Sequence, residues 1–117
     1  MVDGLLSKNK TILGVSPVTW LKSIKNETEM QGRRAAMVRD GAAMVQFLYW
    51  LDTHIGKEDI SELDIAEKLR EFRSKQALYK GESFGTIAGY REHGAIVHYS
   101  ASPESNSLLK PEGFVLV

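Results

Sequence analysis

The sequence predicts an α+β fold, with helices in the first two thirds of the chain and antiparallel strands after them. Up to about Gln76 the apolar residues recur at spacings of three and four, which is the period of an amphipathic helix. Beyond Lys80-Gly81 the pattern changes to short alternating runs with the period of a β-strand. Clusters rich in Pro, Gly, Asn and Ser separate these runs, as expected for turns.

The first two helices have clear start signals. Ser16 as N-cap and Pro17 at the first helical position predict a short helix to about Lys25. Asn26 followed three residues later by Glu29 predicts a capping box at the start of a second, longer helix.

The long second helix should end near Gly56, which suits a C-terminal stop. Its predicted apolar face comprises Met30, Met37, Val38, Met44, Val45, Leu48 and Leu51. Gly41 lies inside this helix and costs about 1 kcal/mol relative to alanine. Close packing against a neighbouring element would explain that glycine.

A third helix is predicted to begin after Ser61, its N-cap. Ile60 and Ile65 occupy the two positions of a hydrophobic staple around that cap. The apolar residues of the helix, at spacings of four and three, are Ile65, Leu69 and Phe72. The pattern continues to about Gln76.

Three strands are predicted, at residues 84–90, 95–99 and 114–117. In the first, one face would carry Phe84, Thr86, Ala88 and Tyr90. In the second, Ile96 and His98 would share a face. Residues 103–106 and 110–113 are predicted to form turns.

The bulk composition excludes several functional classes. Fifteen basic residues balance fifteen acidic ones, so no net field favours nucleic acid or an anionic membrane. The absence of cysteine excludes disulfides, thiolate zinc sites and a cysteine nucleophile, and it fits a reducing compartment such as the cytoplasm. Residues 1–10 lack the apolar region of a secretory signal.

His98 is the sharpest candidate for chemistry, because an imidazole can donate to a developing oxyanion or return a proton to a leaving amine. We expect it to project from a strand towards a cavity. From the pattern alone, a hydrogen-bonded core histidine is the stronger interpretation and catalysis the alternative. His93, in a turn, and His54, at a helix end, are interpreted as structural or solvated.

Other site types have little support in the residues themselves. The carboxylates fall mainly on helix surfaces and do not alternate with histidines at metal-ligand spacing. The glycines after residue 80 are not followed by a helix start, which excludes a phosphate loop. Asn106, in its turn, is expected to bond the local backbone.

Several ordered motifs resemble the catalytic domain of aminopeptidase P (Xaa-Pro aminopeptidase), a member of the creatinase/methionine-aminopeptidase-like pita-bread family. They are residues 16–29, Arg39-Asp40-Gly41, Glu71-Phe72-Arg73, Ser83-Phe84-x-Thr86-Ile87, Gly94-Ala95-Ile96-Val97-His98-Tyr99, residues 103–106 and residues 113–117. The resemblance covers nearly the whole chain from about Ile12 onward.

The resemblance implies the first half of a pita-bread fold, whose two α/β halves enclose two divalent metal ions, commonly manganese. It implies hydrolysis of the bond between an N-terminal residue and a following proline. His98 matches an active-site histidine that contacts the substrate and is not a metal ligand, so the resemblance favours catalysis for it. Phe84 matches an aromatic residue that lines the substrate pocket, although a strand phenylalanine is equally often core.

The resemblance also implies that much is missing. Residues 1–15 would be a connector from absent N-terminal domains, and residues 16–117 the truncated N-terminal half of the metallopeptidase catalytic domain. The metal-binding aspartates, histidine and glutamates would follow the strand at 114–117, in which the chain stops. We therefore expect no metal ion and no peptidase activity in these 117 residues alone.

The unpartnered strands predict self-association of this chain, and the resemblance implies a homodimeric parent that acts on peptides with proline second. Two alternatives remain open. Pita-bread folds also occur as non-enzymatic modules that bind proteins or peptides. A third possibility is an unrelated helical interaction domain with a short hairpin, which predicts an exposed His98 and no sheet facing a cleft.

Overall fold

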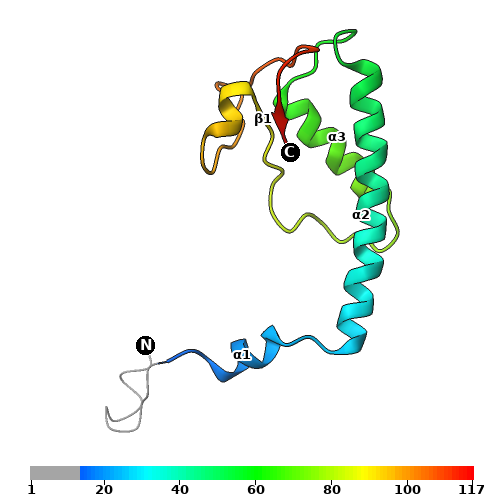
Figure 1. The fold of residues 1–117 in the computed structure, drawn as a ribbon, viewed down its shortest axis with the longest axis vertical. Helices are drawn as coiled ribbons and strands as arrows, with labels where there is room; N and C mark the ends of the chain where they lie inside the picture. Colours follow the sequence, from blue (N-terminus) through cyan, green and yellow to red (C-terminus); the bar gives the residue numbers. More distant parts are fainter. Residues whose placement is uncertain (1–13) are drawn as a thin grey trace. The chain divides into compact units, whose positions relative to one another are not determined.

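The computed structural model describes residues 14–117, so most of the predicted connector at 1–15 lies outside the described residues. The chain divides into two compact units, Met1–Arg33 and Arg34–Val117. The described elements are α1 (Pro17–Ser23), α2 (Glu27–His54), α3 (Glu62–Ser74), β1 (Gly89–Tyr90), the 3₁₀ helix η2 (Arg91–Ala95) and β2 (Val115–Leu116) (Figure 1). The candidate site lies wholly within the second unit.

The predicted starts of the first two helices are confirmed. Pro17 opens α1. The side chain of Ser16 makes no capping bond, but the backbone carbonyl oxygen of Ser16 accepts a hydrogen bond from Trp20 N–H at 3.1 Å. The capping box of α2 forms in both directions. Asn26 N–H donates to Glu29 Oε2 at 2.8 Å, and Glu29 N–H donates to Asn26 Oδ1 at 2.9 Å.

The C-terminal end of α2 also agrees with the sequence. The helix ends at His54, and Gly56 follows with φ 76°. That left-handed conformation is the one that glycine adopts without penalty. The His54 ring lies 5.4 Å from that of Trp50, and its Nδ1 lies 2.8 Å from the Trp50 carbonyl oxygen, which is a structural role.

The apolar face predicted for α2 is largely wrong. Its exposed members are Met30, Met37, Val38, Val45 and Leu48. The fully buried residues are instead Ala43 and Phe47, with Met44 and Leu51 packed beside them. Gly41 has open space where a Cβ would be, so close packing does not explain it. Apolar residues surround much of this helix, and only its neighbours select the face that is buried.

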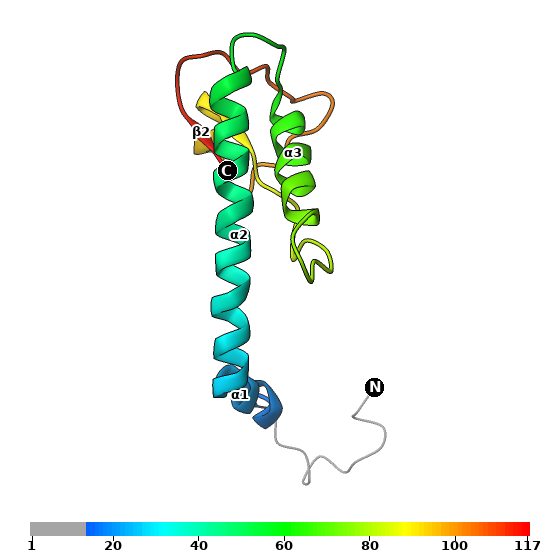
Figure 2. The same ribbon diagram turned by 90° about the vertical axis from the view of Figure 1, so that its right-hand side faces the viewer.

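The third helix matches its prediction closely. Ser61 caps α3 by accepting from Asp64 N–H at 3.3 Å, and Asp64 Oδ2 accepts from Ser61 N–H at 2.8 Å. Ile65 and Leu69 are buried, as the spacing predicts. Figure 2 shows α3 beside the C-terminal part of α2.

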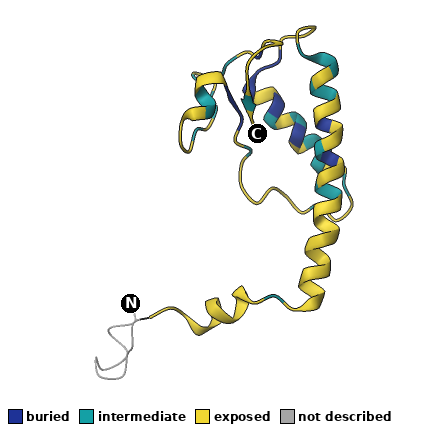
Figure 3. Ribbon diagram, viewed as in Figure 1, coloured by how far each residue is buried: buried dark blue, intermediate teal, exposed yellow. Residues whose placement is uncertain are grey.

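One hydrophobic cluster holds the second unit together. Its buried members are Phe47, Ile60, Ile65, Leu69, Ala88, Tyr90 and Leu109. They come from α2, from α3 and β1 with the residues just before them, and from the segment after residue 107, so the core joins parts of the chain that are about sixty residues apart. In Figure 3 the buried positions gather on α3, on the adjoining stretch of α2 and on the strand segment.

Most of the predicted strand structure does not form. The ladder is limited to Gly89 opposite Leu116 and Tyr90 opposite Val115, in antiparallel register. In the first predicted strand Phe84 is exposed while Ala88 is buried, so these residues do not share a face.

The predicted strand at 95–99 is wrong. Residues 91–95 form η2, and residues 97–98 form a turn. A strand is stable only when a neighbour satisfies its backbone groups, whereas here the chain folds back over Gly89. A Cβ on Gly89 would lie 2.9 Å from the Gly94 nitrogen, so only glycine permits this approach.

The predicted turns at 103–106 and 110–113 are confirmed by the turn and bend conformations at these positions. The Asn106 side chain bonds a distant backbone group, whereas a bond to the local backbone was expected. Its Oδ1 accepts from Leu63 N–H at 3.1 Å, across 43 residues. The second turn is completed by Gly113 at φ 88°. The first turn returns the chain to the N-terminal end of α3, where Glu62 N–H donates to the Ser107 carbonyl oxygen, and the second leads into β2 beside β1.

Candidate functional site

An open cleft of about 760 Å³ lies in the second unit, between α2, the end of α3 and residues 76–87. Asp40 and Arg73 form an ion pair on its wall, with Arg73 Nε donating to Asp40 Oδ1 at 2.7 Å and Nη2 to Oδ2 at 3.3 Å. The pair therefore joins two of the motifs on which the family resemblance depends, although they are 33 residues apart. A bidentate pair of this kind fixes both side chains in orientation.

Phe84 lies on the wall of this cleft, with three quarters of its surface exposed. Ile87 and Leu116 add further apolar surface to the lining of the cleft. The arrangement can hold an apolar side chain against the aromatic ring, while the Asp40–Arg73 pair presents charge elsewhere on the wall. The role of Phe84 in a substrate pocket stays a prediction.

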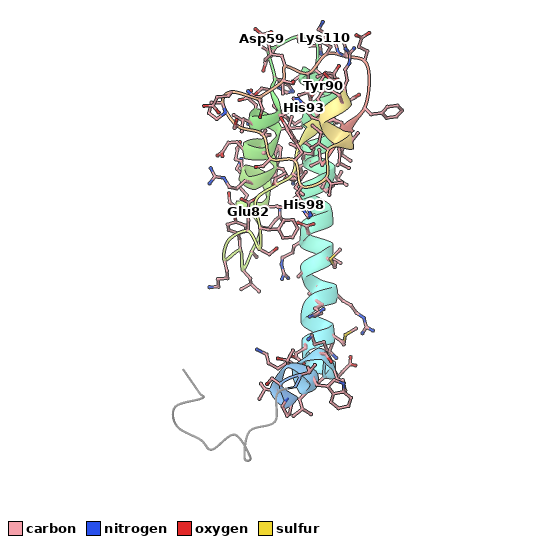
Figure 4. The ribbon with its side chains drawn as sticks, turned by 90° about the vertical axis from the view of Figure 1, so that its left-hand side faces the viewer. Asp59, Glu82, Tyr90, His93, His98 and Lys110 are labelled. Atoms are coloured by element: carbon pink, nitrogen blue, oxygen red, sulfur yellow. The ribbon has the colours of Figure 1, made fainter. Side chains whose placement is uncertain are left out.

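His98 is not where the sequence predicted it. It lies in the turn at residues 97–98, it is exposed, and it does not belong to the residues that line the cleft. Its φ of 59° falls in the left-handed region, which few non-glycine residues adopt. Figure 4 shows His98 well apart from Tyr90 and His93. The prediction that its ring projects from a strand into a cavity is wrong, and its chemical role stays a prediction.

A second cluster surrounds the carboxylate of Glu62, which is fully buried at the first position of α3. Glu62 Oε1 accepts from Tyr90 N–H at 2.6 Å and lies 2.9 Å from His93 Nδ1. Glu62 Oε2 accepts from the Tyr99 hydroxyl at 2.7 Å and from Ser107 N–H at 3.1 Å. Four donors from four separate points of the chain thus converge on one carboxylate.

The environment favours the ionised form of Glu62. Burial opposes ionisation, but the hydrogen bonds from Tyr90, Tyr99, His93 and Ser107 outweigh it and hold the pKa of Glu62 below its ordinary value. Since an ionised carboxylate can only accept, His93 Nδ1 must carry the hydrogen. Burial, together with the neighbouring Glu62 carboxylate, raises the pKa of Tyr99, so its hydroxyl remains a donor.

Sequence reasoning missed this cluster, apart from the structural reading of His93. The partners of Glu62 lie 28 to 45 residues along the chain, a separation at which no spacing rule applies. The available signal was an acidic residue directly after the Ser61 cap, between the two buried isoleucines of the staple. On a helix surface, however, such a residue is ordinarily solvated.

Acid should weaken the second unit through Glu62. Because its folded-state pKa lies below its ordinary value of 4.5, its contribution is complete above that pH and is lost as the pH falls through the folded-state pKa. We expect urea denaturation between pH 7 and pH 3 to show a stability difference between the wild-type chain and Glu62→Gln that narrows as the pH falls.

Glu71 supplies the control for that titration. Lys68 and Lys75 lower the pKa of Glu71 to about 2, but the three side chains are substantially exposed. Its contribution should therefore diminish when salt is added. The contribution of the buried Glu62 to the free energy of unfolding should persist at high salt. If salt reduced the contributions of Glu62 and Glu71 equally, the acid sensitivity could not be assigned to the buried carboxylate.

The described residues do not fit a dinuclear metal centre. Within residues 14–117, no three side chains of His, Asp or Glu lie close enough together to hold a metal ion. Glu62 and His93 already contact each other, and Asp40 forms an ion pair with Arg73.

In the part of the chain that the structure describes, none of the helices has the length and apolar content that a membrane crossing requires.

Comparisons with known proteins agree on one family. Residues 31–117 match metallopeptidase family M24. Aminopeptidase P2 of Arabidopsis thaliana is 41% identical over 103 residues, which cover 87% of this chain and 14% of that protein. The probable Xaa-Pro aminopeptidase P of Laccaria bicolor is 40% identical over 113 residues, which cover 96% of this chain and 17% of that protein.

A solved structure shows the same similarity. The X-prolyl aminopeptidase of Caenorhabditis elegans, described as a cytosolic enzyme with a di-nuclear active site, superposes with a TM-score of 0.81 at 33% identity. The match covers 88% of this chain and 17% of that one. It confirms the predicted α+β class and the pita-bread fold.

These findings also exclude one of the two alternatives left open by the sequence, the unrelated helical domain. An exposed His98 is what an unrelated helical domain predicted, but the match over residues 31–117 excludes an unrelated chain. The chain spans 14 to 17% of the length of the relatives described here. On the family match over most of its residues, this chain belongs to metallopeptidase family M24.

Proposed function

We propose that these residues form part of a metal-dependent aminopeptidase that hydrolyses the bond between an N-terminal residue and a following proline. The observation that carries the proposal is the roughly 40% identity, over most of the chain, to proteins named as Xaa-Pro aminopeptidases. Because the chain spans 14 to 17% of those proteins, the activity is assigned to a longer protein that contains it.

Phe84 is proposed to line the pocket for the substrate. Its position on the wall of a cleft that Ile87 and Leu116 also line supports this role, because an apolar side chain could pack against these apolar groups. The Asp40–Arg73 pair supports it further by holding the middle of α2 and the end of α3 in place beside the cleft.

His98 is proposed to donate a hydrogen bond to the oxygen that becomes negatively charged during hydrolysis. Its exposed imidazole is free to meet a substrate held by residues outside this chain. The neighbouring Val97 is 82% exposed, which supports a further part of the protein covering this turn. We propose that His98 lies at the interface between this turn and that further part of the protein.

Two divalent metal ions, most commonly manganese in the resembling family, are proposed for the longer protein. Since residues 14–117 do not fit such a centre, its ligands would lie in other residues. We further propose a cytoplasmic location, a homodimeric parent, and self-association of the 117-residue chain through its exposed apolar surface. The substrate is a peptide with proline in second position.

The test uses the longer protein and the 117-residue chain side by side. With metal supplied, the longer protein should release the first residue from a peptide with proline second, and the short chain should release none. In the longer protein, His98→Ala should lower kcat by roughly a hundred- to a thousandfold, as expected for loss of one oxyanion donor.

His54 provides the matched histidine control, because it contacts Trp50 at the end of α2 and not the proposed substrate. His54→Ala should leave kcat nearly unchanged. Release of the first residue by the short chain, or full activity in His98→Ala, would contradict the proposal.

A further inference from the structure

The turn that carries His98 is closed by side chains and not by strand pairing. His93 lies at its entry and Tyr99 at its exit, and both side chains bond the carboxylate of Glu62. Their rings stack with centroids 4.5 Å apart and an interplanar angle of 26°. The five-residue segment between them, residues 94–98, is therefore held at both ends by one acidic residue.

Glu62, the anchor of this segment, is itself held by several hydrogen bonds. Glu62 is fully buried, and its backbone N–H donates to the Ser107 carbonyl oxygen at 3.1 Å while Ser107 N–H donates to its Oε2 at the same distance. Tyr90 N–H adds a bond from β1. Hydrogen bonds to a charged acceptor are about twice as strong as neutral ones, so the carboxylate ties the segment to both α3 and β1.

The conformation of His98 needs such an anchor. A φ of 59° is unfavourable for a residue with a Cβ, and strained positions persist only when their surroundings impose them. Within the segment, Ile96 N–H donates to the His93 carbonyl oxygen at 3.2 Å, and Tyr99 N–H donates to that of Ile96 at 3.1 Å. Because both ends of the segment are fixed, the chain between them follows these two successive turns.

We propose that Glu62 is a positioning residue for His98: by holding His93 and Tyr99 it sets the direction in which the imidazole is presented. The catalytic consequence of this rests on the proposed function, but the conformational effect does not. Tyr99 connects the two residues, because it follows His98 directly in the chain and its hydroxyl donates a hydrogen bond to the Glu62 carboxylate.

The first experiment measures order in the 117-residue chain. Backbone ¹⁵N relaxation should give Val97 and His98 the order parameters of rigid backbone, about 0.85, and values towards 0.6 in Tyr99→Phe. That variant removes one hydroxyl and keeps the ring that stacks on His93. The amides of Ile65 and Leu69 report whether the fold is intact, and Glu92→Gln, an exposed change at the entry of the same segment, is the control.

The expected result is lower order at His98 in Tyr99→Phe with no change at Ile65, and wild-type order in Glu92→Gln. Glu62→Gln should release the segment further. If Glu62→Gln fails to fold, the order of His98 in Tyr99→Phe still tests the proposal. Unchanged order at His98 in folded Tyr99→Phe would overturn the proposal.

The second experiment tests the consequence in the longer protein. Tyr99→Phe should lower kcat about tenfold with little change in KM, since a lost bond to a charged group is worth at least that factor. In the double variant with His98→Ala it should cost nothing more, because the two residues act through the same group. Additive losses would contradict positioning, whereas an inactive wild-type protein would contradict the proposed function and leave the relaxation result standing.

Discussion

Phe47→Ala should lower the free energy of unfolding of this chain by about 3–5 kcal/mol, the range for removing a buried aromatic ring. Phe47 is fully buried at the centre of the hydrophobic cluster that joins α2 to α3 and β1. The change removes apolar surface that water cannot reach and leaves a cavity that these elements cannot close. Urea denaturation followed by far-ultraviolet circular dichroism measures the loss directly.

Phe114 is the matched control, because the same substitution is made in a side chain that is 90% exposed. Phe114→Ala should change the free energy of unfolding by no more than about 0.5 kcal/mol. Similar losses for the two variants would show that α2 does not pack against the core through Phe47.

Glu62→Ala should be nearly as damaging, with an expected loss of about 3–5 kcal/mol, because each buried donor left without a partner costs about 1–3 kcal/mol. The reason differs from that for Phe47. The substitution leaves Tyr90 N–H, Ser107 N–H and the Tyr99 hydroxyl without an acceptor in a region that water reaches poorly. The same denaturation experiment at pH 7 gives the comparison.

Two further variants identify the cause. Glu62→Gln keeps an acceptor oxygen and similar volume, so it should recover part of the loss. Glu67→Gln removes a charge of the same type from the exposed surface of α3, where it pairs with Arg70, and should cost far less than Glu62→Ala. A small effect of Glu62→Ala would mean that the four contacts do not stabilise the fold.

The helix boundaries were predictable because their signals are local. The predicted capping box at Asn26 and the predicted cap at Ser61 each involve residues three apart, and both form. The spacing of Ile65 and Leu69 likewise defines the buried side of α3, because that helix has a single apolar stripe.

The strands were predicted poorly because a strand depends on a neighbour that sequence spacing does not identify. Residues 84–88 and 95–99 have the alternation of strands, but only Gly89–Tyr90 meets a partner, at Val115–Leu116. The segment before Tyr99 bonds Glu62 through its side chains instead. Its local pattern could not reveal a carboxylate more than thirty residues away.

The sequence by itself determined the helical first part of the chain, the positions of its caps and turns, and the family to which it belongs. Those properties depend on contacts a few residues apart or on the order of motifs along the chain. Only the tertiary structure decided which face of α2 is buried, that Asp40 meets Arg73, and that Glu62 closes the segment carrying His98. These depend on burial and on hydrogen bonds between distant residues, whose free energy is realised only when the chain has folded.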